Sequence, residues 1–423
     1  MKRKIIIFFF FIFFYSINLL ANYILIPMDK TQTNHLKAYG LAYWIISDKC
    51  KIKKIYWLLN YRGGSFLSPV SEEIIKKAKY SGVSFEIINE IQKNSIDIEI
   101  ENNNMSKVEL EKAPKIAVYI PNNKNPWDDA VTLALTYAEI PFDKIWDDKI
   151  LKDGLNKYDW LHSHHEDFTG QYDKFFKNYN KSSWYINKVN KSRQFANKLN
   201  FNSVREEKLA VAKKIREFVK KGGFFFAMCS ATESLDVALS LEGVDYISPE
   251  IDGTPFDKNY MQKINYNNCL MFRDFKVFSD PYYNPKSEID YNIVNTRNRK
   301  EDPPFELFDF SAKFDQVPCI LTQNHQRIIK GFFGLTTSYL QKFLKKKVVV
   351  LGYSLNKVKT AKYIHINYGK GSITYLGGHD PEDYAHKVGA EPTNLNLHKH
   401  SAGYRLILNN VLFPAVKKKK LKT

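Results

Sequence analysis

The sequence predicts an α/β protein in which a doubly wound parallel sheet follows a small N-terminal α/β domain. Apolar runs of strand length alternate with helical patterns along residues 22–112, and again from residue 113 onward. A polar, asparagine-rich stretch at 102–114 separates the two units and predicts a linker. In the second unit a basic helix ends at Gly222-Gly223, an apolar run follows, and Cys229 stands where the next helix begins. We therefore expect domains at 22–112 and 113–416, with a basic tail at 417–423.

The composition is that of a globular chain. The 423 residues are 44% hydrophobic and 26% charged, which suits two or three cores and is unlike a disordered chain. The formal net charge is +18, and eight of the positive charges lie in Lys2-Arg3-Lys4, Lys417–Lys420 and Lys422. We find no aromatic-basic nucleic-acid motif. The charge therefore favours solubility or loose contact with anionic surfaces over a nucleic-acid partner.

The first 21 residues predict export. A positive segment is followed by an apolar run from Ile5 to Tyr15 and then by Ser16 to Ala21, the layout of a secretory signal peptide cleaved after Ala21. A periplasmic or extracellular location follows. An uncleaved membrane anchor is the alternative, because Leu19 suits the minus-three position poorly. The four cysteines lack metal-ligand spacing, and in an oxidising compartment some could pair: Cys50, Cys229, Cys269 and Cys319.

The N-terminal unit is expected to contain three strands and two helices. Strands are predicted at 23–27, 56–61 and 84–88, and helices at 29–41 and 72–81. The turn Arg62-Gly63-Gly64-Ser65 closes the second strand and could cradle an anion.

The second unit repeats the alternation and then loses it. Strands are expected at 115–120, 142–146, 158–162 and 224–228, and helices at 130–139, 206–221 and from residue 230. Residues 245–347 read as an irregular insertion. Regularity returns with a strand at 348–351, a hairpin of 363–368 with 372–376 across a glycine-rich turn, and a helix at 402–413.

Cys229 has the sequence context of a nucleophile elbow. A strand, a tight turn and a helix would place it at a corner, and Ala227 and Ala231 are small, as such a corner requires. The N-terminus of the following helix should lower the pKa of the thiol and favour the thiolate. A buried structural cysteine is the alternative interpretation.

A base for this thiol is predicted at His379, just beyond the last strand. We expect His379 to deprotonate Cys229, and Asp380 or Glu382 to orient the imidazole. The N–H groups after Cys229 would form part of an oxyanion hole, with Ser230 among the substrate-binding residues. A loop histidine that caps a turn is the alternative.

A second polar cluster follows the strand at 158–162, in the run His162-Ser163-His164-His165-Glu166-Asp167. On a strand, His162 and His164 face the same side and make a workable pair of metal ligands. The third ligand would be one of His379, His386, His398 and His400. The preferred interpretation holds no metal or other cofactor, and assigns these residues to substrate positioning: His162, His164, His165 and Glu166.

Two of these segments resemble a known superfamily. The run from Lys221 to Asp236, taken with Gly369 to Asp383, resembles the class I glutamine amidotransferase-like proteins, and its closing part is similar to the trehalose-utilisation (ThuA-like) branch. Nearly the whole mature chain is also similar to exported Bacteroidetes proteins called asparagine synthetase B, on residues 23–29, 127–130, 158–162 and the Cys229 elbow. The resemblance implies a flavodoxin-like sheet and a cysteine nucleophile with a histidine base.

The residues depart from these families at defined points. Ala227 and Ala231 stand where the class I elbow usually has glycines, and Pro381 stands where its acid usually lies. True asparagine synthetases use an N-terminal cysteine and an ATP-pyrophosphatase domain. Here residue 2 is Lys2, and we find no phosphate-loop signature.

Three functions stay open on the sequence. The first is an exported, thiol-dependent amide hydrolase or amidotransferase acting on a small molecule. The second is a non-catalytic binding protein for a sugar or an amino-acid derivative. The third is a metal-dependent hydrolase built on His162, His164 and His379.

Overall fold

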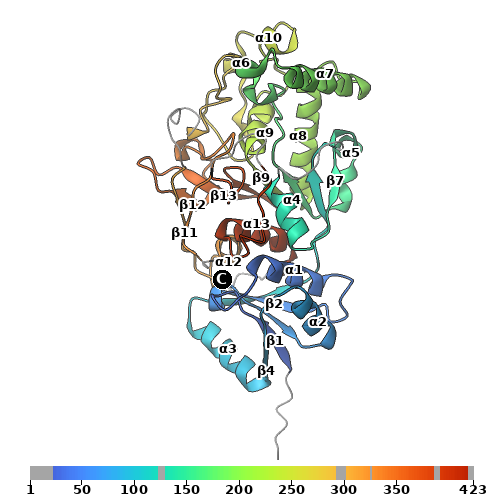
Figure 1. Ribbon diagram of the computed structural model, residues 1–423. Coiled ribbons are helices and arrows are strands. Elements are labelled where there is room, and N and C mark those ends of the chain that lie inside the picture. Colours follow the sequence, from blue (N-terminus) through green and yellow to red (C-terminus); the bar gives the residue numbers. More distant parts are fainter. Residues whose placement is uncertain (1–21, 122–128, 292–301, 324–325, 385–390, 418–423) are drawn as a thin grey trace, which may run out of the picture.

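The computed structural model describes residues 22–121, 129–291, 302–323, 326–384 and 391–417 (Figure 1). The predicted signal peptide, most of the basic tail, Trp127, Asp128 and His386 lie outside the described residues. Within the part of the chain that is described, every helix is too short or too polar to cross a membrane.

Two sheets organise these elements. The strands are β1 (Tyr23–Ile26), β2 (Ile55–Leu59), β3 (Phe66–Pro69), β4 (Glu86–Ile88), β5 (Ser106–Leu110), β6 (Ile116–Tyr119), β7 (Asp143–Ile145), β8 (Trp160–Ser163), β9 (Phe224–Met228), β10 (Phe305–Leu307), β11 (Ile328–Ile329), β12 (Val349–Ser354), β13 (Ala361–Tyr368) and β14 (Gly371–Leu376). The helices are α1 (His35–Ile46), α2 (Glu72–Tyr80), α3 (Glu90–Asn102), α4 (Ala130–Tyr137), α5 (Asp147–Leu151), α6 (Phe176–Tyr179), α7 (Ser183–Lys198), α8 (Val204–Lys221), α9 (Ser230–Ser240), α10 (Pro249–Asp252), α12 (Gln316–Thr322) and α13 (Ala402–Leu412).

The N-terminal sheet has five strands in the order β4-β1-β3-β2-β5, and all its pairings are antiparallel. Alternate strand residues point to opposite faces. Ile24 and Ile26 therefore join the core under α1 and α2, whereas Leu25 packs with Ile96 and Ile100 of α3 on the other face.

Three predictions for this unit need correction. β5 lies inside the stretch predicted as a linker, where residues 106–110 alternate between buried and half-buried positions as a half-buried strand does. α1 begins at His35 and not at Asp29, because the Asn34 side chain accepts the Lys37 N–H at 3.1 Å and caps the helix there. The glycine turn at 62–65 is not an open anion cradle, because the side chain of Gln323 fills the space beside Gly64.

The second sheet is mixed, whereas the sequence predicted a parallel one. Its order is β11-β10-β12-β13-β14-β9-β8-β6-β7, with parallel pairing from β14 to β7 and antiparallel pairing from β14 to β11. The predicted hairpin explains the change of direction, since a two-residue connection can join only antiparallel strands. Numbered along the chain, the five parallel strands run 2-1-3-4-5, one of the two common orders of doubly wound sheets.

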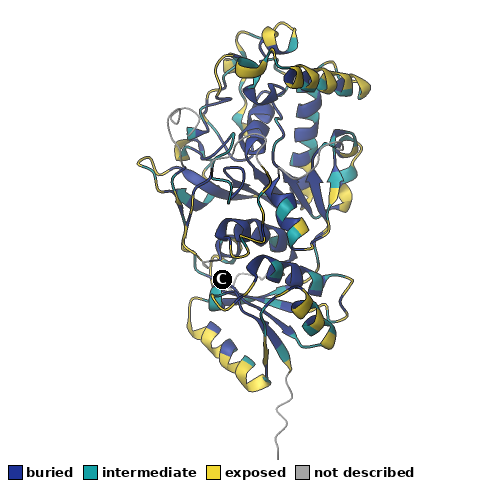
Figure 2. Ribbon diagram, in the orientation of Figure 1, coloured by how far each residue is buried: buried dark blue, intermediate teal, exposed yellow. Residues whose placement is uncertain are grey.

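Helices cover both faces of this sheet (Figure 1). α4 and α13 pack on one face beside residues such as Val118 and Phe226, and α5, α8 and α9 pack on the other beside Leu161 and Phe225. The first of these cores also contains α1 and the inner face of the N-terminal sheet. Figure 2 accordingly shows α1 and α13 buried between the two sheets.

Candidate functional site

The carboxyl ends of β8, β9 and β14 lie side by side and bring the predicted site residues to one sheet edge. Ser163 is paired with Ala227, and Met228 is paired with Leu376. His164, Cys229 and the Gly377-Gly378 pair therefore leave the sheet together. Open α/β sheets bind ligands at this edge.

Cys229 occupies the predicted corner between β9 and α9. Its backbone has φ 48° and ψ −131°, which a non-glycine residue adopts only under strain. Its N–H donates to the Gly378 carbonyl at 3.0 Å, and the Ala231 N–H donates to the His164 carbonyl at 3.1 Å. The elbow is thus tied by backbone hydrogen bonds to both neighbouring strand ends.

A segment of the predicted insertion covers the thiol. The Leu335 N–H donates to Cys229 Sγ at 3.2 Å, and the His379 N–H donates to the Phe333 carbonyl at 2.7 Å. Gly334 is pressed so closely against Gly378 that an added Cβ would lie 2.9 Å from its Cα. Cys229 is consequently only 1% exposed.

Burial decides the acidity of this thiol. It raises the pKa of Cys229 to about 11, although backbone N–H groups of residues 335, 336 and 230 act in the opposite direction. The structure therefore corrects the prediction that the helix N-terminus lowers this pKa. All four cysteines are buried and free, so none of them forms a disulfide.

Three histidines converge next to the elbow. His164, His165 and His379 each offer a ring nitrogen within 4.8 Å of the other two. His165 Nε2 and His379 Nε2 are 3.3 Å apart, and the His164 and His165 rings stack at 4.3 Å between centroids. His164 and His379 are buried and His165 is half-buried.

Asp129 orients one member of this trio. Its Oδ1 lies 3.2 Å from His164 Nδ1 and 3.5 Å from His162 Nε2. Burial alone would raise the pKa of Asp129, but the two imidazoles hold it well below its usual range. Burial, with His165 nearby, lowers the pKa of His164 to about 3, so its ring is neutral. No role in the site was predicted for Asp129 from the sequence.

The trio fits a divalent metal ion. Two nitrogen ligands at about 2.0–2.1 Å from a tetrahedral ion lie about 3.3–3.4 Å apart, and the His165–His379 separation is 3.3 Å. His164 Nε2 is buried and has no hydrogen-bond partner among the described residues. Its Nδ1 meets a carboxylate, which is the outer-sphere contact that metal-binding histidines typically make.

The other predicted site residues are distributed differently. His162 joins Asp129 instead of the trio, and its Nδ1 lies 2.9 Å from the Phe226 carbonyl. Asp380 accepts hydrogen bonds from Thr393 at 2.8 Å and Tyr404 at 2.9 Å, which anchor it toward α13. Burial raises the pKa of Asp380.

Glu382 and Glu166 have local partners. Glu382 accepts a hydrogen bond from Tyr384 at 2.6 Å and lies 3.1 Å from His398 Nδ1. Glu166 accepts a hydrogen bond from Ser163 at 3.1 Å. His398 therefore contacts Glu382 and does not join the histidine trio. Among the described residues, the third histidine beside His164 and His165 is His379. The pairing of Cys229 with His379 stays a prediction.

Ser230 belongs to a buried charge network that the sequence did not reveal. Its hydroxyl donates to Asp173 and lies 3.2 Å from Lys286 Nζ. Burial alone would lower the pKa of Lys286, but the surrounding carboxylates of residues 167, 173 and 233 raise it. Tyr172, Asp173 and Lys174 all have φ between 53° and 59°, a strained left-handed run. Lys286 comes from the irregular insertion, where periodicity gives no signal.

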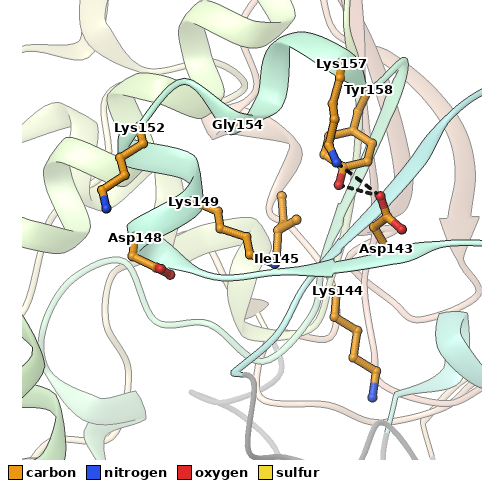
Figure 3. Close-up of a pocket in the computed structure, with 9 residues that line it drawn as sticks. All are labelled: Asp143, Lys144, Ile145, Asp148, Lys149, Lys152, Gly154, Lys157 and Tyr158. Atoms are coloured by element: carbon orange, nitrogen blue, oxygen red, sulfur yellow. Dashed lines mark hydrogen bonds and ion pairs between the residues drawn. The ribbon is translucent and has the colours of Figure 1, made fainter.

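A surface hollow of about 590 Å³ lies elsewhere, along β7 and α5 (Figure 3). Lysines line it, and Lys157 and Tyr158 both reach Asp143 at its wall. Neither the elbow nor the histidine trio lines it. Because its lining residues include no cysteine, serine or histidine and belong to neither candidate metal-ligand group, we place the candidate site at the carboxyl edge of the sheet.

Comparisons with known proteins give slight likenesses. No family model and no curated protein matches the chain. Similar solved structures include cytoplasmic protein STM3548 from Salmonella typhimurium, with a TM-score of 0.32, 12% identity, and coverage of 72% of this chain and 100% of that one. A ThuA-like protein from Bacteroides uniformis matches with a TM-score of 0.27, 12% identity, and coverage of 69% and 90%.

A GH42 β-galactosidase from Bacillus circulans sp. alkalophilus matches with a TM-score of 0.26, 10% identity, and coverage of 64% of this chain. The chain spans only about 29% of the length of that enzyme. TM-scores this low do not assign a fold or a function.

Proposed function

We propose that the protein is a metal-dependent hydrolase of a small polar molecule, with His164, His165 and His379 as the metal ligands. The observation that carries the proposal is the convergence of three ring nitrogens within 4.8 Å at the carboxyl edge of the sheet. Three histidines and an open fourth position are the ligand pattern of catalytic zinc sites. This trio differs from the set considered on the sequence, because His165 takes the place of His162.

The surrounding residues would have distinct tasks. Asp129 holds His164 Nδ1 and so directs its Nε2 toward the trio. The neutral state of His164 is the form that binds a metal. His165 is the half-exposed member, so substrate would approach from its side. A bound divalent ion would supply Lewis acidity and activate water for attack.

Metal analysis tests this proposal. The purified chain, reconstituted with zinc, manganese or iron and dialysed, is expected to hold one ion per chain. His165→Ala and His379→Ala should each lose most of that ion, and His400→Ala is the matched control because His400 contacts His35 instead. Less than stoichiometric metal in the parent chain, or equal metal in all variants, contradicts the proposal.

A second candidate is the thiol-dependent amide hydrolase with Cys229 as nucleophile and His379 as base. The strained backbone of Cys229 favours it, because such strain gathers at active sites. A thiol with a pKa of about 11 is almost entirely protonated at neutral pH, so this chemistry needs movement of the segment at 332–337.

The two candidates predict opposite results. Cys229→Ser abolishes amide hydrolysis if the thiol is the nucleophile, and leaves it intact if the metal is responsible. Removing the metal with a chelator abolishes hydrolysis if the metal is responsible, and leaves it intact if the thiol is the nucleophile. If neither treatment matters and a ligand still binds, the non-catalytic binding protein is the remaining interpretation.

We also propose that the second sheet belongs to the flavodoxin-like, class I glutamine amidotransferase-like folds, in the ThuA-like branch. The strand order 2-1-3-4-5 and the strained cysteine between β9 and α9 support this. We further propose export, which the leader at residues 1–21 supports. Mass spectrometry of the chain secreted from its own host would then find Asn22 as the first residue.

A further inference from the structure

α6, the start of α7 and the neighbouring loop at 282–283 form an exposed cluster of aromatic side chains. Trp184 is 47% exposed, Tyr282 is 55% exposed and Tyr179 is 38% exposed. Tyr283, the next residue after Tyr282, is also exposed. α6 and α7 lie toward the end of the molecule that is remote from the N-terminal unit, where Figure 2 shows α7 largely exposed.

The rings hold one another in place. Trp184 packs edge to face against Phe175, at 5.8 Å and 75°, and against Tyr185, at 5.9 Å and 89°. Tyr179 lies 5.0 Å from Trp184 at 58°. Phe176 similarly meets Tyr282 at 5.7 Å and 77°. The cluster is therefore a preformed apolar surface, and its exposed members need no rearrangement to bind.

The segment that carries α6 and α7 is basic, whereas the loop that carries Tyr282 also contains Asp280, whose side chain accepts the Tyr282 N–H. The sequence from Lys174 to Arg205 contains eight lysines and arginines and no aspartate or glutamate. Lys188 pairs with the buried Asp173 at 3.6 Å, and Arg193 donates to the Ile251 carbonyl at 2.8 Å. Lys177, Lys181 and Lys191 form no ion pair within the described residues. They lie two to seven residues from Tyr179 or Trp184 in the sequence and add positive charge to this part of the surface.

We propose that this surface, formed by Tyr179, Trp184, Tyr282 and Tyr283 with Lys177, Lys181 and Lys191, docks the protein on an anionic lipid membrane. Tryptophan and tyrosine settle at the boundary between lipid headgroups and acyl chains. Lysines beside them are attracted to anionic headgroups. The combination of an apolar aromatic face with a basic rim is that of segments lying in the membrane interface.

Nucleic acid suits the surface less well. Single strands stack their bases on free aromatic faces. Here Trp184 contacts three neighbouring rings at 58° to 89°, so it is held within an aromatic cluster and does not project singly as a stacking platform. Insertion into the membrane interface needs only the partly exposed side chains that the cluster offers.

Vesicle sedimentation tests the proposal. The chain is prepared from Asn22, where the described fold begins, so that the apolar leader cannot itself insert. Sucrose-loaded vesicles of phosphatidylcholine alone are compared with vesicles containing about one third phosphatidylglycerol. We expect binding to the anionic vesicles only, weakened when salt rises from about 0.1 M to about 0.5 M.

Two variants separate this surface from general positive charge. The triple variant Lys177→Gln, Lys181→Gln, Lys191→Gln should lose about a hundredfold in vesicle affinity, about fivefold for each lysine. Its control is Lys144→Gln, Lys149→Gln, Lys152→Gln, which removes the same charge from the hollow of Figure 3 and should change affinity less than about threefold. Trp184→Ser should lose about tenfold, and the control Phe314→Ser, at a 78% exposed residue elsewhere, should not.

The outcomes decide the question. Unchanged thermal midpoints would show that the variants fold, and loss confined to the Lys177 and Trp184 variants supports the proposal. Equal loss in both lysine variants overturns it, because general electrostatics then explains the binding. Absence of vesicle binding in the parent chain also overturns it, as does Trp184-dependent binding of single-stranded RNA without binding to vesicles.

Discussion

Replacing Asp129 by asparagine separates two tasks of one carboxylate. Four contacts converge on its Oδ1: the N–H groups of Val131 at 2.8 Å and Thr132 at 3.3 Å, and ring nitrogens of His164 and His162. Its Oδ2 is buried without a partner in the described residues. Asparagine keeps an oxygen at the first position and removes the charge.

The expected magnitudes follow from these contacts. Hydrogen bonds to a charged group contribute about 1.5–3 kcal/mol and neutral ones about 0.5–1.5 kcal/mol, so Asp129→Asn should destabilise the fold by about 1–2 kcal/mol. Asp129→Ala also removes the cap of α4, which is worth about 1 kcal/mol, and leaves buried donors unsatisfied at about 1–3 kcal/mol. Together with the lost charge, its total should be about 3–6 kcal/mol.

Unlike stability, metal affinity should fall by a similar factor in both variants. Loss of the carboxylate behind His164 is expected to weaken metal binding about 10- to 100-fold in both variants, because outer-sphere partners act on this scale. Urea unfolding of the metal-free chain measures stability, and competition with a chromophoric chelator measures affinity. If Asp129→Asn folds normally and binds the metal as tightly as the parent, Asp129 does not support a metal ligand and the reasoning fails.

Three further predictions concern the frame around the site. Burial raises the pKa of Asp236 to about 6. The folded chain therefore keeps a proton that the unfolded chain releases near pH 4. As the pH rises from about 4 to about 6, this group lowers the free energy of unfolding. In urea unfolding, the stability of Asp236→Asn relative to the parent should therefore rise by about 3 kcal/mol between about pH 4 and pH 7. A difference in stability that does not change with pH would contradict this. Gly334→Ala should displace the segment that covers Cys229 and destabilise the fold by about 1–3 kcal/mol. Iodoacetamide should then label Cys229 faster, as followed by mass spectrometry. An unchanged labelling rate would show that this segment does not protect the thiol. Lys362→Met should destabilise the fold by about 3–5 kcal/mol because it breaks the buried 2.6 Å ion pair with Asp302. Adding Asp302→Asn should restore part of that loss in the same unfolding assay.

Local patterns were enough to predict most elements of the second sheet. The apolar run before Cys229 and the glycine-rich turn at 369–371 identified β9 and the β13–β14 hairpin, because both signals depend on neighbouring residues. α3 was missed because it is a largely polar helix that rests on a side-chain capping box, formed by Asn89 and Gln92. α7 was missed for a similar reason, since only three of its residues are buried.

The site was predictable only where residues are close in sequence or follow strands. His164, His165 and Cys229 could be placed at one edge because they end parallel strands. That His165 and not His162 joins the trio could not be predicted. It depends on where the chain leaves β8 and on which side chain points toward His379. Lys286 and Leu335 reach the elbow from an irregular segment, so long-range packing alone determines their positions.

The central place of β14 has a consequence for how the chain folds. β14 ends at Leu376, yet it lies between β9 and β13 and joins the parallel half of the sheet to the antiparallel half. During synthesis, one edge of β9 therefore stays unpaired until β14 is made, when about nine tenths of the chain has emerged. His379 follows directly, so the histidine trio is completed at the same late moment. A chain truncated before residue 371 would therefore lack both the middle of its sheet and its candidate metal centre.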